Sequence, residues 1–190
     1  MAKKNLKLFI PGAIALVFGI VAFCMMFVTG VTYTDKLVGK ASLSISGMKL
    51  AFGGEIEIVS GFPINALEFN IMTTLAFILP LVGGILALLF KNGLVTKIIT
   101  TACFVVGAVF LFSTTGFTAI SLGGQDAKDA LTMLFDEKLA AGPIVAGILS
   151  VLGALVCFFK GTITKKFSKT KPITSAPRHN SGGALSVSNL

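Results

Sequence analysis

Residues 90–97 form a short basic turn between two long apolar runs, 71–90 and 98–122. Neither run carries an ionised side chain, and each is long enough to cross a hydrocarbon core of roughly 30 Å as a helix. The pair Asn92-Gly93 suits a tight reversal, so the runs are expected to be antiparallel neighbours. Lys91 and Lys97 place the turn on the cytoplasmic side, because short cytoplasmic loops are enriched in lysine and arginine.

Two more apolar runs, 8–29 and 139–159, bring the number of expected spans to four. The predicted fold class is an all-α membrane protein. It consists of a four-transmembrane-helix bundle, residues 1–160, with a small extracytoplasmic β-hairpin layer between helices 1 and 2. All 8 acidic residues lie in the two segments between spans that are expected outside, whereas most lysines lie elsewhere. Both termini are therefore predicted to be cytoplasmic, and the net charge of +8 reports orientation, with no nucleic-acid partner expected.

The cysteine pattern bears on the compartment. Cys24, Cys103 and Cys157 lie within spans, and the outer segments contain neither a cysteine nor an Asn-x-Ser/Thr site. This excludes a disulfide-stapled ectodomain and favours a bacterial cytoplasmic membrane over a eukaryotic cell surface. We expect a multi-pass plasma membrane protein whose first partner is the lipid bilayer.

The outer segment 30–69 is long enough to fold by itself. Serine and apolar residues alternate over 41–46, which is the period-two pattern of a half-buried strand. A bulge at Gly47 is expected to carry this strand further. Residues 31–34 are expected to supply an additional strand, since an isolated hairpin is only marginally stable.

A three-residue loop, 53–55, is predicted to turn this strand into a hairpin. In that register Phe52 pairs with Ile56 and Leu50 pairs with Ile58.

The same register leaves Glu57 on the face turned toward water. Glu55 and Glu57 are therefore the predicted outer recognition surface. Binding of a divalent cation by these carboxylates is the alternative, because such ions prefer oxygen ligands.

Small residues recur at spacings of three and four on two of the predicted helices. They form two ridges: Gly12, Ala15 and Gly19 on the first helix, and Gly142, Ala146, Ser150 and Ala154 on the fourth. In lipid, close approach over small residues holds helices together. Both ridges are predicted to serve helix packing or a partner interface, and the second is the expected contact with a partner.

The third span is the most polar of the four. Its hydroxyls, together with a proline in the second span, are candidate cavity-lining residues: Ser113, Thr114, Thr118, Ser121 and Pro80. Hydrogen bonding to backbone carbonyls or between helices is the other use of such hydroxyls. Pro80 is expected to kink its helix, either as a fixed bend or as a hinge.

Two segments complete the outline. Residues 126–136 are predicted to form an outer amphipathic helix capped by Asp126. Residues 161–190 are predicted to be a disordered basic tail. Together with Lys160, its lysines are expected to attract anionic lipid headgroups, namely Lys165, Lys166, Lys169 and Lys171.

The sequence lacks the side chains of a catalytic centre. No Asp, Glu, Lys, Arg or His lies in the interior of a span, where such groups usually mark function. The single histidine, His179, lies in the predicted tail, and the cysteines form no Cys-x-x-Cys pair. We therefore expect no enzyme activity, no cofactor and no metal.

Four helices, a short inner turn, a larger strand-bearing first outer segment and a smaller second one resemble the claudin-like tetraspan membrane proteins. The resemblance covers about residues 8–159 and is one of topology alone. The family's Trp-Gly-Leu-Trp motif and cysteine pair are absent from this chain, which has no tryptophan. The resemblance implies an outer sheet over a bundle that serves lateral association or an accessory role.

Two functions are compatible with this outline. The first is a structural or accessory subunit, non-catalytic, that associates with itself or with a larger membrane complex. The alternative is a small transporter or channel for an uncharged or lipidic solute, with the third span's hydroxyls along its path.

Overall fold

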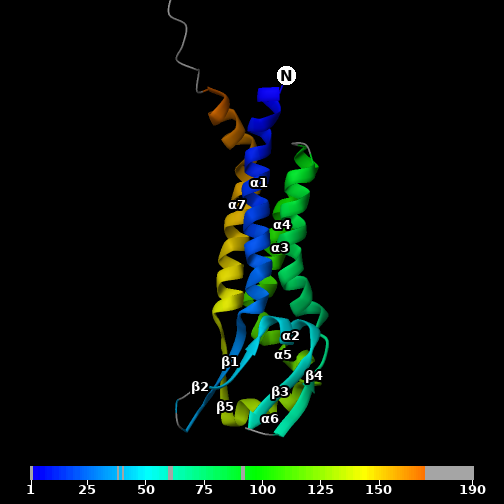
Figure 1. The fold of residues 1–190 in the computed structure, drawn as a ribbon, viewed down its shortest axis with the longest axis vertical. Helices are drawn as coiled ribbons and strands as arrows, with labels where there is room; N and C mark the ends of the chain where they lie inside the picture. The colour runs from blue at the N-terminus through cyan, green and yellow to red at the C-terminus, as the bar shows by residue number, and fades with distance from the viewer. Residues whose placement is uncertain (1, 38, 40, 60–61, 91–92, 170–190) are drawn as a thin grey trace, which may run out of the picture.

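Four long helices run side by side in the computed structural model, which describes residues 2–37, 39, 41–59, 62–90 and 93–169 (Figure 1). They are α1 (Ala2–Cys24), α3 (Ile71–Leu89), α4 (Leu94–Phe112) and α7 (Ala141–Lys169). All four are long and apolar enough to cross a membrane, which confirms the prediction of four apolar spans. Helices α1 and α4 each pack against both α3 and α7, so that the four form a ring.

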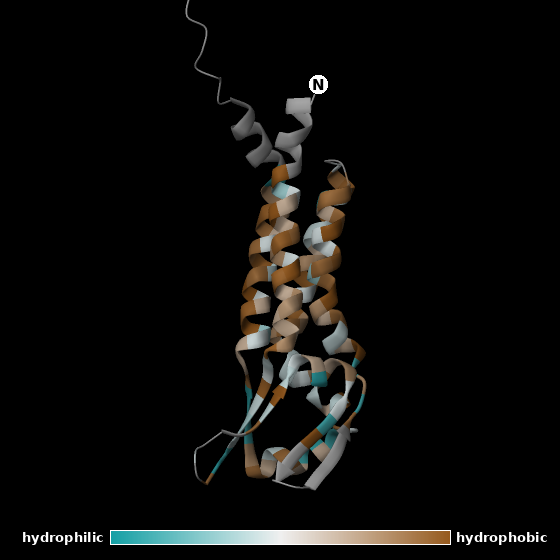
Figure 2. Ribbon diagram, in the orientation of Figure 1, coloured by the Kyte–Doolittle hydropathy of each residue, from teal (hydrophilic) through white to brown (hydrophobic). Residues whose placement is uncertain are grey.

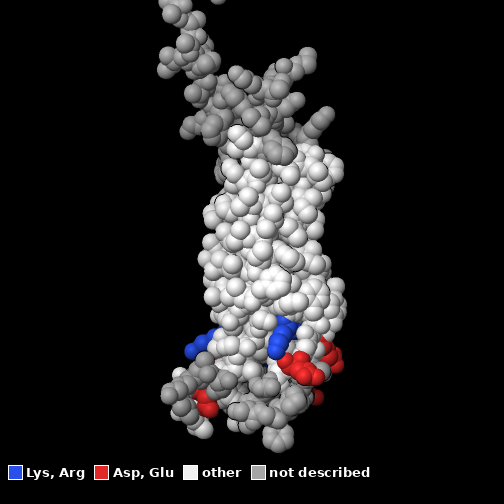
Figure 3. Space-filling model, viewed as in Figure 1, with Lys and Arg blue, Asp and Glu red and all other residues white. Residues whose placement is uncertain are grey.

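The ends of the bundle differ. The N-terminus and the segment joining α3 to α4 lie at one end, which we call the inner end, and the strands gather at the other (Figure 1). Apolar residues dominate the long helices and give way to mixed polarity among the strands (Figure 2). Among the described residues on the face shown in Figure 3, the charged side chains lie over or next to the strand-bearing part, and none lies farther along the bundle.

Two of the four helices end several residues earlier than predicted. The first helix passes into a short 3-10 helix, η1 (Met25–Phe27), and strand β1 starts at Thr29. The third apolar run, expected to be a single helix to residue 122, divides at Ser113 into α4 and α5 (Thr114–Ser121).

The fourth helix is longer than expected. Helix α7 continues to Lys169, so the prediction of a tail starting at 161 is wrong for its first nine residues. Extending an existing helix adds one hydrogen bond per residue and needs no new nucleus, so the basic segment follows the span as a helix. Residues 170–190, the rest of the predicted tail, lie outside the described residues.

The outer part contains a three-stranded antiparallel sheet in the order β2-β1-β5 (Figure 1). Its strands are β1 (Thr29–Asp35), β2 (Ala41–Ser46) and β5 (Phe135–Leu139). The central strand β1 pairs Tyr33 with Leu43 of β2 and with Glu137 of β5. The strand predicted at 31–34 is thereby confirmed, and the sheet joins the two outer segments.

The predicted hairpin through residues 53–55 is wrong. Residues Gly47–Phe52 form helix α2, so Leu50 and Phe52 have no strand partners and Gly47 is not a bulge. Strand β3 (Gly54–Val59) pairs instead with β4 (Phe62–Leu67), and Ile56 lies opposite Asn65.

Capping and burial explain why α2 is helical. The Ser46 hydroxyl accepts a hydrogen bond from the Lys49 amide at 3.3 Å, which is an N-cap interaction. Gly53 ends the helix with a φ of 85°, a conformation that favours glycine. The buried residues Gly47, Leu50 and Ala51 recur at helical spacing.

The outer amphipathic helix exists but is shifted. Helix α6 spans Gln125–Leu134, and Asp136 belongs to β5 instead. The predicted cap at Asp126 is wrong, because the helix begins one residue earlier and Gly124 precedes it without a side-chain cap. Asp126 therefore lies in the first turn, where a carboxylate still interacts favourably with the helix dipole.

The strands, α2 and α6 form an outer domain with its own apolar core, made of Val31, Tyr33, Ile45, Leu50, Ile56 and Leu67. A second cluster lies where this domain meets the bundle and includes Ala51 of α2, Met26 of η1 and Phe77 of α3. Helix α2 is therefore packed on both sides and forms the floor between sheet and bundle (Figure 1).

Candidate functional site: the junction between outer domain and bundle

The first small-residue ridge lies between α1 and α3. A Cβ atom on Gly12 would come within 2.7 Å of the Ala87 carbonyl oxygen, and one on Gly19 within 2.6 Å of the Pro80 carbonyl oxygen. Ala15, between them, is fully buried. These residues let the two backbones approach closely, as predicted for helix packing.

The second ridge is also occupied within the chain. A Cβ atom on Gly142 would meet the carbonyl oxygens of Thr29 and Met25 at 2.8 and 2.9 Å. Ala146 and Ser150 are fully buried, and Ala154 is nearly so. Of the two uses predicted for this ridge, the structure shows helix packing within the chain.

Three of the four hydroxyl residues predicted to line a cavity in the third span are buried within the protein. Thr114 donates to the Leu111 carbonyl and Thr118 to the Thr115 carbonyl, each at 2.8 Å. Both side chains are buried, as is Ser121, whereas Ser113 is exposed at the break between α4 and α5. The two grooves considered below contain none of these four residues in their walls.

Pro80 is buried inside α3, which is a single helix from Ile71 to Leu89. A Cβ atom on Gly107 of α4 would lie 2.8 Å from the Pro80 ring. Pro80 therefore packs between α1 and α4, since Gly19 contacts its carbonyl from the other side.

Asn70 connects three elements at the outer end of the bundle. Its Oδ1 accepts from the Met72 and Thr73 amides at 3.1 and 3.2 Å, which caps α3. Its Nδ2 donates to the Phe117 carbonyl at 2.8 Å and to the Ser121 hydroxyl at 2.9 Å. Asn70 is fully buried, and these four bonds satisfy both donors and both acceptor lone pairs of its side-chain amide.

The last carbonyls of α2 accept hydrogen bonds from residues around Asn70. The Ser121 hydroxyl donates to the Leu50 carbonyl at 2.9 Å. The Asn70 amide and the Thr74 hydroxyl donate to the Ala51 carbonyl at 2.9 and 3.1 Å. Because the final carbonyls of a helix have no partner within it, these contacts fasten α2 to α3 and α5.

A second polar network lies deeper in the outer domain. The Tyr33 hydroxyl donates to Glu137 Oε1 at 3.0 Å, and Lys128 Nζ lies 3.2 Å from Glu137 Oε2. Lys128 also donates to the Thr115 carbonyl on α5. The network therefore joins β1, β5 and α6 to the end of the bundle.

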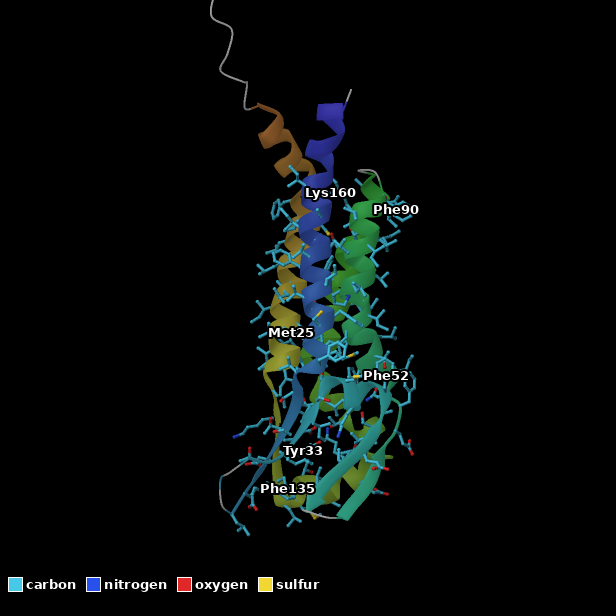
Figure 4. The ribbon with its side chains drawn as sticks, viewed as in Figure 1. Met25, Tyr33, Phe52, Phe90, Phe135 and Lys160 are labelled. Atoms are coloured by element: carbon cyan, nitrogen blue, oxygen red, sulfur yellow. The ribbon has the colours of Figure 1, made fainter. Side chains whose placement is uncertain are left out.

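This network is shielded from water. Tyr33 is fully buried, and the side chains of Lys128 and Glu137 are only 16% and 9% exposed. Burial first, and then the charge of Glu137, raise the pKa of Tyr33 far above its ordinary range. Tyr33 is therefore a neutral donor at physiological pH, which suits a structural hydrogen bond and not proton transfer. Figure 4 shows its side chain within the outer domain.

Lys160 differs from its predicted role in the headgroup cluster. Its side chain is buried at the inner end of the bundle, where Nζ donates to the Ala87 carbonyl at 2.7 Å (Figure 4). That carbonyl belongs to the last turn of α3, where a cation is favoured by the helix dipole. Lys160 therefore links α7 to α3. The side chains of Lys165, Lys166, Lys169 and Lys171 lie outside what is described.

The predicted recognition pair is described in part. The Glu55 side chain is exposed, and its carbonyl accepts from Lys49 Nζ at 2.9 Å. Glu57 belongs to β3, but its side chain lies outside the described residues. Within the part of the chain that the structure describes, no three metal-ligating side chains gather into a group.

Two apolar grooves flank α4. One, of about 340 Å³, lies between α4 and α7. The other, of about 290 Å³, lies between the inner ends of α3 and α4 and includes Phe90 and Ile99. Comparisons with protein-family models, with curated proteins and with solved structures find no match to this chain.

Proposed function

We propose that this chain is a non-catalytic membrane protein, a structural or accessory subunit that associates with itself or with a larger membrane complex through its outer domain. The proposal includes a plasma membrane location with the inner end toward the cytoplasm, and a claudin-like relationship at the level of topology. Its main support is a group of exposed apolar side chains in the turn after β1 and at the end of α6. Both segments lie at the end of the outer domain farthest from the bundle (Figure 1).

The patch, which we call the tip patch, consists of Leu37, Met133 and Leu134. These side chains are 94%, 77% and 64% exposed, although they lie in the part of the molecule expected in water. Leu131 of α6 and the neighbouring Phe135 pack on the core of the outer domain, whereas Met133 and Leu134 do not. Exposed apolar residues that lie close together mark interaction surfaces. The hydrogen bond from the Lys36 amide to the Leu134 carbonyl brings the two segments together.

Lys36 holds the tip patch together. Its amide donates to the Leu134 carbonyl at 3.2 Å, and its ammonium donates to the Thr132 carbonyl. The last turn of α6 thereby gains hydrogen-bond partners, and Leu37 is fixed beside it. Because the outer domain is in turn fastened to the bundle through Asn70 and Lys128, the patch is presented in one orientation, which lowers the entropic cost of binding.

The test is the mass and composition of the full-length protein extracted from its native membrane in a mild detergent. We expect a homo-oligomer or a defined larger complex. The double variant Met133→Ser/Leu134→Ser should release the chain as a monomer. Lys138→Ser, which changes an exposed lysine on β5, should leave the complex intact. A wild-type monomer without companions, or a complex that survives the double variant, would refute the proposal.

A further inference from the structure

The groove between α4 and α7 has the dimensions of a site for one acyl chain. Its walls run from Thr101 to Phe112 on α4 and from Val151 to Phe158 on α7. Along α4 this is about 16 Å, or about half of a hydrocarbon core of roughly 30 Å. The volume of about 340 Å³ lies within the range of small-molecule sites.

The position of the groove indicates which half of a bilayer it serves. Its α7 residues all lie in the half of the span nearest Lys160, at the inner end. A second copy of this chain packing helix against helix would be expected to use the whole length of α4. On α4 the wall runs from Thr101 to the end of the helix at Phe112, so the groove covers the inner half of α7 and more than half of α4. Its length of about 16 Å is close to the hydrocarbon depth of one leaflet and so fits one lipid.

A positive charge near the inner end of the groove, that of Lys97, favours anionic lipids. Lys97 precedes Thr101 by four residues, so it lies one turn nearer the inner end on the same face of α4. All 8 acidic residues of the chain belong to the outer segments, so the sequence places no carboxylate near this lysine. A lysine at the membrane boundary attracts an anionic headgroup.

Thr101 adds a polar group between the lysine and the apolar walls. Its hydroxyl oxygen is buried and has no hydrogen-bond partner among the described residues, unlike that of Thr100, which donates to the Thr96 carbonyl. A change of χ1 rotamer moves the hydroxyl of a threonine to another of three staggered positions. Because Thr101 lines the groove, such a change can bring its hydroxyl to the groove wall, where an ester carbonyl can accept its hydrogen bond.

From these observations we infer that the α4–α7 groove binds an anionic phospholipid of the leaflet at the inner end. The order of groups along α4 matches the order of groups in the lipid. Lys97 meets the phosphate, Thr101 meets the glycerol ester, and the apolar walls between Val105 and Phe112 hold one acyl chain. This site does not depend on the proposed oligomer, since it lies within one chain.

The experiment is native mass spectrometry of the full-length protein in detergent with phosphatidylglycerol or phosphatidylcholine of identical chains. We expect one phosphatidylglycerol to be retained in preference to phosphatidylcholine by about fivefold, the effect of one lysine near a headgroup. Lys97→Gln should abolish that preference. Val109→Phe, which fills the groove at an exposed position, should lower retention of both lipids by about tenfold.

Val106→Phe is the matched control. Val106 is an exposed residue of the same helix that is not part of the groove wall, so this change should leave retention as in the wild type. Thr101→Val should lower retention of both lipids with the preference unchanged. Equal retention by the Val109→Phe and Val106→Phe variants would overturn the inference. So would equal retention of the two lipids by the wild type, or a dimer that Val109→Phe dissociates.

Discussion

Tyr33 is the only tyrosine of the chain, and its surroundings are set by residues that lie far away in the sequence. Its hydrogen-bond partner Glu137 is 104 positions distant. Burial in the outer core and the nearby carboxylate both disfavour the tyrosinate form. The folded state therefore holds the phenolic proton more tightly than the unfolded state does, which links the stability of the outer domain to alkaline pH.

We expect Tyr33 to stay protonated in the folded protein at about pH 11, where an unfolded tyrosine with a pKa of about 10 is mostly ionised. Above about pH 10 the unfolded chain loses this proton while the folded chain keeps it. The free energy of unfolding should then fall with rising pH by about 1.4 kcal/mol per pH unit from this group. An alkaline titration followed by tyrosinate absorbance measures the ionisation of Tyr33, because the chain has one tyrosine and no tryptophan.

The Tyr33→Phe variant supplies the control for that titration. It lacks the ionisable phenol, so its stability should fall less steeply above pH 10 than that of the wild type. A tyrosinate signal that rises near pH 10 in the folded wild type would show that Tyr33 is not shielded as described.

At the scale of single elements, local signals identified α3, α4 and the first strand but misled at α2. Met48, Leu50 and Phe52 alternate as in a strand, although Ser46 and Gly53 on either side are residues typical of helix ends. The buried face is Gly47, Leu50 and Ala51, which follows the helical period. Period-two and helical patterns overlap over six residues, so only the capping residues could have distinguished them.

The sequence contains a weaker signal for β5 than for the long helices. Phe135, Glu137 and Leu139 are partly buried, and the charged residues between them are exposed, which is a strand pattern. The residues around β5 do not indicate that β1 is its partner, or that Tyr33 and Lys128 lie beside Glu137. Contacts of the candidate site depend on tertiary packing between distant segments, whereas the spans follow from length and hydropathy alone.

The contact between α1 and α3 gives a test at this scale. Gly19→Ala would place a Cβ atom 2.6 Å from the Pro80 carbonyl oxygen and 3.2 Å from Leu81 Cα, so the helices must separate. We expect a loss of about 1–3 kcal/mol in the free energy of unfolding, typical of overpacking. Unfolding in mixed detergent, followed by circular dichroism, measures the change.

Gly116→Ala is the matched substitution on α5. Nothing lies within 4 Å of a Cβ atom at Gly116, so the better helix propensity of alanine should leave stability unchanged or raise it by up to about 1 kcal/mol. Equal effects of the two substitutions would mean that α1 and α3 are not in the close contact described.

For the whole molecule, the separation of the two ends predicts how the chain sits in a membrane. In a Cys24→Ala background, Leu37→Cys on the outer domain should react with a membrane-impermeant maleimide added to intact cells. Gly93→Cys, at the opposite end of the bundle, should react only after permeabilisation. The reverse pattern would place the outer domain in the cytoplasm and contradict the orientation inferred from the lysines.

The central place of β1 in its sheet also constrains how the protein is made. One edge of β1 pairs with β2, which follows at once, but the other edge pairs with β5, which precedes α7. A nascent chain with three spans inserted therefore displays an unpaired strand edge, and such edges invite pairing with other chains. The sheet closes only after the ribosome has made β5, which follows three of the four long helices in the chain. Completion of the outer domain thus requires that the first three of these helices and β5 have all been made.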